Sequence, residues 1–144
     1  MATTELAIQA RGMSKTFGKV QAVRDFDLDV PRERIYGFLG PNGSGKSTTI
    51  RMLCGLLTPT AGDIEVLGYP IPGEAEALRR KVGYMTQKFS LYEDLTALEN
   101  LQFMANIHSL PRSARRDRID AVTERYHLGG FRDQRAGTLS GGQK

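Results

Sequence analysis

The sequence has few of the features that mark secreted, membrane-spanning or disordered proteins. Cys54 is the only cysteine among 144 residues, so no disulfide can form within the chain, which fits a reducing cytosol. No apolar run reaches the roughly 18 residues of a membrane-spanning helix, and residues 1–13 contain no apolar core of signal-peptide length. A composition of 40% hydrophobic and 25% charged residues favours a folded chain over disorder. Any role at a membrane would therefore come through a partner.

The charge balance gives little reason to expect nucleic-acid binding. There are 20 basic and 16 acidic residues, and the net charge of +4 is small for a nucleic-acid-binding domain. Much of the excess lies in RSARRDR, residues 112–118. We interpret this run as a solvated helix face in preference to a binding patch. No nucleic-acid partner is predicted.

The first part of the chain has the alternation and the short apolar runs of strands. In residues 26–30, Phe26, Leu28 and Val30 alternate with polar residues, and residues 63–68 alternate in the same way. Residues 35–40, IYGFLG, form an apolar run that predicts a parallel strand buried on both faces, and residues 82–85 predict a further strand. Together these patterns favour an α/β fold.

Helical patterns separate and follow these strands. Apolar residues at helical spacing predict a helix after Gly45, and its members are Ile50, Leu53, Cys54 and Leu57, with Cys54 a small buried hydrophobe. Residues 74–81 predict a short helix. Thr96 with Glu99 forms a capping box that begins a helix with Leu98, Leu101 and Ala105 on one face. Pro111 begins another, with a stripe of Ile119, Val122 and Tyr126 that ends at residues 128–130.

One segment carries a specific chemistry. Residues 40–48, GPNGSGKST, fit the phosphate-loop pattern G-x-x-x-x-G-K-[ST] between a predicted strand and a predicted helix. Glycines let backbone N–H groups turn toward phosphates, Lys46 supplies positive charge at the β- and γ-phosphates, and the Ser47 hydroxyl is a hard ligand for Mg²⁺. The residues expected to bind the nucleotide here are Gly40, Pro41, Asn42, Gly43, Ser44, Gly45, Lys46, Ser47 and Thr48. The motif predicts a nucleoside triphosphate, but kinases, GTPases and motor ATPases share it.

The phosphate loop and the later LSGGQ, residues 139–143, together resemble the ATP-binding cassette (ABC) family of ATPases, in which LSGGQ is the signature motif. The resemblance covers the whole chain. It implies an α/β P-loop NTPase core of the RecA-like type with an antiparallel β part and an α-helical subdomain, incomplete at the C-terminus. It divides the chain into residues 1–88, up to the Q-loop, and residues 89–144, the helical subdomain that ends in the signature.

The resemblance also implies roles for single residues. Gln87 matches the Q-loop glutamine that contacts Mg²⁺ and the attacking water, and with Lys46 it is a candidate catalytic residue. Phe17 lies where the family has an aromatic side chain on adenine, and an ordinary core phenylalanine is the alternative. The signature would bind ATP held by a second cassette in a head-to-tail dimer, through Ser140, Gly141, Gly142 and Gln143. Ser140 is also expected to cap a helix that begins just after it.

Residues 83–101 are most similar to the ATPase components of exporters, particularly bacterial drug-efflux systems. This implies ATP and Mg²⁺ as cofactors, a transmembrane permease subunit or domain as partner, and a peripheral place on the cytoplasmic face of the inner membrane. Phe89, Leu91 and Tyr92 are candidate contacts for the membrane component, with simple packing as the alternative.

The family pattern continues with a Walker B strand ending in aspartate, a catalytic glutamate and a switch histidine. None of them follows residue 143 here, and His108 and His127 precede the signature. In the family, the Walker B strand and its successor lie between the phosphate-loop strand and the Q-loop strand. We therefore expect the first part of a cassette, with two unpaired sheet edges, marginal stability and no ATPase activity alone. A soluble ABC-type ATPase acting on ribosomes and a non-hydrolysing nucleotide-binding module are the alternatives.

Overall fold

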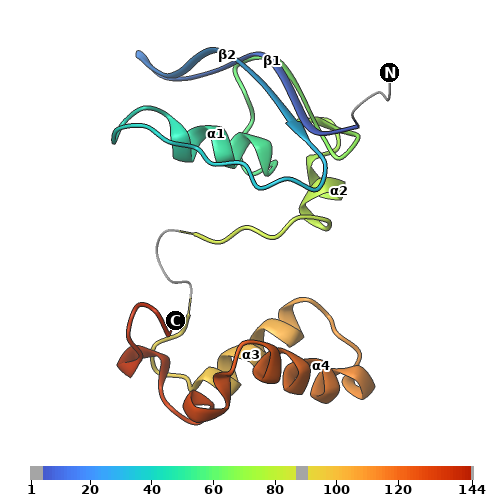
Figure 1. The fold of residues 1–144 in the computed structure, drawn as a ribbon, viewed down its shortest axis with the longest axis vertical. Helices are drawn as coiled ribbons and strands as arrows, with labels where there is room; N and C mark the ends of the chain where they lie inside the picture. The colour runs from blue at the N-terminus through green and yellow to red at the C-terminus, as the bar shows by residue number, and fades with distance from the viewer. Residues whose placement is uncertain (1–4, 87–90, 144) are drawn as a thin grey trace. The chain divides into compact units, whose positions relative to one another are not determined.

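The computed structural model describes residues 5–86 and 91–143. The chain divides into two compact units, Met1–Tyr84 and Met85–Lys144 (Figure 1). The domain boundary that we predict at residue 88 falls within residues 87–90, which lie outside the described part.

A four-stranded antiparallel sheet forms the frame of the first unit. Its strands are β1 (Leu6–Phe17), β2 (Val20–Pro31), β3 (Ala61–Val66) and β4 (Tyr69–Ile71), in the order β2-β1-β3-β4. Leu28 and Val30 are buried while their neighbours Asp27 and Asp29 are exposed, which confirms the predicted alternation in this strand. The side-chain period of two therefore turns one face of β2 toward the core.

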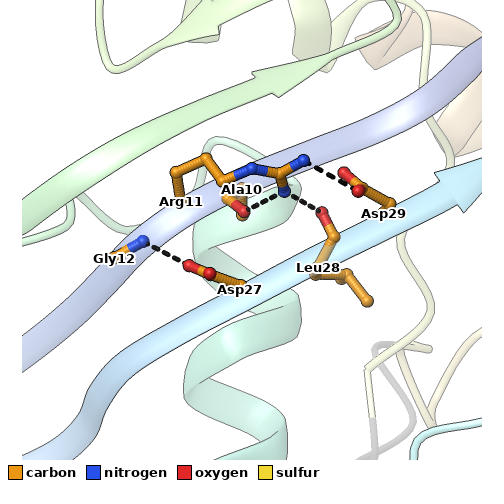
Figure 2. Close-up of polar contacts among 6 residues, drawn as sticks. All are labelled: Ala10, Arg11, Gly12, Asp27, Leu28 and Asp29. Atoms are coloured by element: carbon orange, nitrogen blue, oxygen red, sulfur yellow. Dashed lines mark hydrogen bonds and ion pairs between the residues drawn. The ribbon is translucent and has the colours of Figure 1, made fainter.

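A polar cluster fixes the register of β1 against β2 (Figure 2). The pairing shifts between Ala10 and Met13, where β1 has one residue more than β2. At this bulge the Gly12 N–H, with φ of 58°, donates to Asp27 Oδ1 at 2.7 Å. Arg11 donates to Asp29 Oδ2 at 2.7 Å, and this hydrogen bond lowers the pKa of the Asp29 carboxyl. A one-residue shift of β1 against β2 would turn the core side chains toward solvent. By fixing the register, these hydrogen bonds keep those side chains buried.

Two helices complete the core of the first unit. They are α1 (Lys46–Leu53), which Figure 1 shows alongside the sheet, and α2 (Ala75–Arg79). Met13 from β1, Met52 from α1 and Leu78 from α2 are fully buried in one cluster. At about 25 cal/mol for each Å² of apolar surface, the burial of such side chains is the main force that holds α1 against the sheet. The packing of α1 thereby holds the end of the phosphate loop that leads into this helix.

The predicted helical stripe after Gly45 is only partly correct. The helix ends at Leu53, and Gly55 follows with φ of 65°. Ile50 is 36% exposed, and Cys54 is half-buried rather than buried. Burial still raises the pKa of the Cys54 thiol, which keeps it protonated near neutral pH.

The two expected parallel strands, residues 35–40 and 82–85, do not form strands in the described structure. Ile35 is 104% exposed, Leu39 95% and Met85 89%. These segments are not strands because a strand needs a neighbouring strand to hydrogen-bond with its N–H and C=O groups. No described strand lies against either segment. Residues 35–40 thus reach the phosphate loop as an unpaired segment.

The second unit is helical, with α3 (Ala97–Ile107), α4 (Arg112–Arg125) and two short 3₁₀ turns, η1 (Leu128–Phe131) and η2 (Ala136–Thr138). The predicted capping box is confirmed, because Thr96 Oγ1 accepts from the Glu99 N–H at 3.1 Å and Glu99 Oε2 accepts from the Thr96 N–H at 2.7 Å. Figure 1 shows α3 and α4 side by side, and Ile119 is buried in their contact region. The predicted stripe is wrong at Tyr126, which is 64% exposed because α4 ends at Arg125.

Backbone hydrogen bonds hold the segment before the signature motif against the segment that begins α3. The Gly137 N–H donates to Glu93 O at 3.0 Å, and the Ala136 N–H donates to Leu95 O at 2.8 Å. Nearby, Ala97 and Leu98 donate to carbonyl oxygens of residues 134 and 132. This pairing fixes the chain up to residue 137, two residues before LSGGQ.

Candidate nucleotide-binding site

The phosphate loop lies between the unpaired residues 35–39 and α1. Gly43 and Gly45 have φ of 82° and 86°, the left-handed region that glycine adopts without strain. A Cβ at Gly45 would lie 2.5 Å from Ala22 O, so the loop also passes too close to β2 for a larger residue. At Gly43 no atom lies within 4 Å of the same position. Gly43 is thus required by its backbone conformation alone, and Gly45 by both its conformation and its close approach to β2.

Lys46 is the first residue of α1, and its ammonium group turns back over the loop. Nζ donates to Gly40 O at 2.7 Å and to Pro41 O at 2.6 Å, and lies 3.5 Å from Ser44 Oγ. The structure therefore brings the lysine together with both ends of the glycine-rich segment. A positive charge held there is in position for a phosphate that the loop encloses.

The amino end of α1 adds a second source of positive potential. Gly45 is the N-cap, no side chain caps the helix, and its first turn has no acidic residue. Uncapped first-turn N–H groups and the helix dipole both favour an anion at this end. The next residue, Ser47, is exposed, and its hydroxyl makes no hydrogen bond to any described residue. A hard oxygen in this position suits Mg²⁺, so the donor chemistry fits the predicted metal.

A cavity of about 510 Å³ lies next to the loop and is large enough for a small ligand. Its lining combines residues of the loop with residues of β2, and includes Gln21, Ala22, Arg24, Phe26, Phe38, Gly40, Gly43, Ser44, Lys46 and Thr49. Asn42, Gly45, Ser47 and Thr48 belong to the motif but are not part of this lining.

Phe17 lies at the end of β1 and does not line that cavity. The residue is 49% exposed, which argues against the alternative of a core phenylalanine. The Lys15 ammonium lies 5.1 Å from the ring centre. A role for Phe17 under adenine stays a prediction.

Gln87 and Phe89 lie outside the described residues. Leu91 is half-buried, and Tyr92 is 53% exposed with its ring 4.6 Å from that of Phe103. Tyr92 therefore packs against Phe103, as the packing alternative expects, while roughly half of its surface is accessible to solvent.

The signature motif forms a compact turn. Leu139 is 7% exposed, the Ser140 N–H donates to Gln143 Oε1 at 2.9 Å, and the Gln143 N–H donates to Ser140 O at 3.0 Å. Residues 141–143 form a turn, so the helix predicted to start just after Ser140 is not seen within the described residues. Gly141 and Gly142 are exposed.

Sequence reasoning missed the residue that supports this region. Asn100 is 4% exposed, its Oδ1 accepts from the Tyr92 N–H at 2.9 Å, and its Nδ2 donates to Tyr92 O at 3.0 Å and to Thr96 O at 2.9 Å. It therefore holds the turn to which residues 136 and 137 are paired. An asparagine in the first turn of an otherwise apolar helix face was the available signal.

Comparison with known proteins now adds to this geometry. The family model described as ABC transporter matches residues 23–144. The chain belongs to the ABC transporter family. Its phosphate loop, capping-box helix and signature turn are thus parts of an ABC nucleotide-binding domain.

Three relatives of this ABC chain are named for multidrug transport, drug resistance or import. It is 42% identical to the probable multidrug ABC transporter ATP-binding protein YbhF of Escherichia coli, over 86% of this chain and 22% of that protein. It is 39% identical to the daunorubicin/doxorubicin resistance ATP-binding protein DrrA of Streptomyces peucetius, over 96% and 42%. It is 38% identical to the methionine import ATP-binding protein MetN 2 of Enterococcus faecalis, over 100% and 43%. The chain thus spans less than half the length of these relatives.

Two solved structures share the fold. CbiO1 from Clostridium perfringens, part of an ABC transporter complex, has a TM-score of 0.83 at 24% identity, covering 96% of this chain and 57% of that one. The dimeric ATP-binding cassette MJ0796, bound to ADP and phosphate, has a TM-score of 0.77 at 27% identity, covering 94% and 64%. The expected fold class, a P-loop NTPase of the ABC type, is confirmed.

Proposed function

We propose that this chain provides the ATP-binding part of an ABC exporter, in which ATP binding and hydrolysis are coupled to transport by a separate membrane component. The observation that carries the proposal is the phosphate loop, where Lys46 Nζ lies 2.6–2.7 Å from two loop carbonyl oxygens at the uncapped end of α1. The signature turn in the second unit supports an ABC mechanism over the other P-loop chemistries.

Several residues of the loop have a definite task in this proposal. Backbone N–H groups at Gly43 and Gly45 enclose the phosphates, and Lys46 exchanges its two carbonyl partners for β- and γ-phosphate oxygens. Ser47 and Gln87 would hold Mg²⁺, which supplies neutralisation of phosphate charge when bound. Thr48 donates to the α-phosphate. Ser140 to Gln143 bind the γ-phosphate of ATP on a second cassette.

The proposal further assigns the chain to the cytoplasmic face of the inner membrane, against a permease subunit or domain. None of the helices among residues 5–86 and 91–143 has the length and apolar character to cross a bilayer. Export is favoured by residues 83–101 and by the two relatives named for drug transport or resistance. An importer is the second candidate, because one relative is named for methionine import.

Equilibrium titration with ATP and Mg²⁺ tests nucleotide binding. Lys46→Ala should abolish measurable binding, because the charge over the loop is lost. Lys19→Ala is the matched control, since it removes the same charge from the exposed turn between β1 and β2. Equal affinities for the two variants would refute the assignment of the site.

Cell fractionation separates transport from the alternatives. The tagged protein, expressed from its complete gene with the neighbouring genes, should sediment with membranes and be released when the permease is deleted. Sedimentation with ribosomes would favour the soluble ribosome-associated ATPase and contradict the exporter proposal.

A further inference from the structure

A strongly basic cavity lies between α3 and α4 of the second unit. Its volume is about 480 Å³, and its lining is Leu98, Gln102, Asn106, Arg112, Arg115, Arg116, Ile119, Asp120 and Arg132. Four guanidinium groups face one carboxylate, an excess of three positive charges at one place. Like charges gathered in this way repel one another unless an anion joins them.

The one carboxylate leaves most of this charge without a hydrogen-bonding partner. Asp120 lies 3.8 Å from Arg116 Nε and 3.8 Å from Arg132 Nη1, which is beyond hydrogen-bond distance for both. Arg112 has no hydrogen bond or ion pair to any described residue. These three side chains therefore keep free N–H donors at the cavity.

Arg115 is held in place and retains one unused donor. Its guanidinium donates to Asn106 Oδ1 and, at 2.9 Å, to Leu110 O, which fixes the group between the two helices. Its Nε atom is buried and has no hydrogen-bond partner among the described residues. A buried donor without an acceptor costs free energy, and the charge of an anion bound nearby would offset part of that cost.

The position of the arginines on α4 strengthens the same argument. Arg112, Arg115 and Arg116 occupy the amino-terminal part of the helix, which has no acidic residue in its first turn and no side-chain cap at Pro111. The helix dipole is positive at this end, so cationic side chains there are unfavourable by themselves. A bound anion would relieve both the mutual repulsion and the dipole.

We propose that this cavity binds a phosphate-bearing anion, held by Arg112, Arg115 and Arg116. A carboxylate carries one negative charge, whereas a phosphate monoester carries about 1.5 to 2. The phosphate therefore comes closer to neutralising the excess of three positive charges in the lining. The cavity of about 480 Å³ has room for a ligand larger than a single oxyanion. A free diphosphate compound and an anionic phospholipid headgroup share this chemistry.

The test uses the full chain with Lys46→Ala, so that the phosphate loop does not contribute. Arg112→Gln with Arg116→Gln removes two exposed arginines of the lining. Arg118→Gln with Arg125→Gln is the matched control, because it removes the same charge from the same helix outside the lining. Calorimetric titration with inorganic pyrophosphate and sedimentation with phosphatidylglycerol vesicles are measured at low ionic strength, since salt screens exposed charges.

The first double variant should bind its probe about 10- to 100-fold more weakly than the parent, and the control should change less than about threefold. Loss of pyrophosphate binding identifies a free anion as the ligand, and loss of vesicle binding alone identifies a headgroup. Equal weakening by both double variants, or binding of neither probe by the parent, would overturn the proposal. The site is separate from the phosphate loop, so its failure leaves the proposed function untouched.

Discussion

Asn100 is the side chain whose removal should reveal most about how the signature motif is supported. In Asn100→Ala, the Tyr92 N–H loses its side-chain acceptor at 2.9 Å. The carbonyl oxygens that Nδ2 contacts keep other donors, because Leu95, Ala136 and Asn100 supply backbone N–H groups to Tyr92 O, Leu95 O and Thr96 O. One donor is therefore orphaned, while each carbonyl loses only a second bond.

The magnitude follows from this count. An orphaned donor costs about 1–3 kcal/mol, and each of the three secondary bonds contributes about 0.5 kcal/mol or less, so we expect a loss of about 1–4.5 kcal/mol. Asn100→Asp keeps the shape and the acceptor but turns a charged oxygen toward three carbonyls, and should be no more stable than the alanine variant.

Urea unfolding followed by far-ultraviolet circular dichroism measures this change. Gln102→Ala is the control, because this residue of α3 is exposed and its side chain makes no hydrogen bond to any described residue, and it should stay within about 0.5 kcal/mol of the parent. A change below about 0.5 kcal/mol for Asn100→Ala, equal to the control, would refute the reasoning that this side chain holds residues 92–96 in place.

Three further predictions concern other parts of the fold. Gly45→Ala should destabilise the first unit by more than the roughly 1–2 kcal/mol of left-handed strain expected for Gly43→Ala, because only at Gly45 would the added Cβ also lie 2.5 Å from a β2 carbonyl oxygen; unfolding curves compare the two. The folded-state pKa of Asp29 is lowered from 3.8 by its bond to Arg11, so its stabilisation is complete above that value and is lost as pH falls through the folded pKa; Asp29→Asn should lose this acid dependence. Thr96→Ala should cost about 1 kcal/mol by thermal unfolding, and an unchanged midpoint would contradict the capping role.

Short-range patterns were the reliable part of the sequence. The capping box at Thr96 depends on two side chains three residues apart, and the structure has both hydrogen bonds. The alternation in β2 likewise depends only on neighbours along the strand. Such features are decided within one turn or one strand, so the sequence contains all of their partners.

Features that depend on distant partners were predicted less well. Residues 35–40 have the apolar composition of a buried strand, but burial needs a strand on either side, and Ile35 and Leu39 are almost fully exposed. Tyr126 has the correct helical spacing, but α4 ends one residue before it. Neither outcome could be read from the local pattern.

In the candidate site, the residue pattern alone indicated the phosphate loop, whereas its contacts needed the structure. The pattern places a lysine after the last glycine, but only the structure shows Lys46 turned back onto Gly40 O and Pro41 O. The charge run at residues 112–118 has the composition of a solvated face. In the structure Arg112, Arg115 and Arg116 line a cavity and Arg118 does not, because α4 turns only the first three toward α3.

Thermal unfolding of the purified chain, with and without Mg²⁺ and ATP, tests the central claim most directly. A ligand at about 100 times its dissociation constant that binds only the folded state adds about 2.7 kcal/mol of stability. The account predicts a shift of this size for the parent chain and for Lys19→Ala, and no shift for Lys46→Ala. No shift in the parent chain, or the same shift in Lys46→Ala, would contradict a phosphate loop that binds the nucleotide.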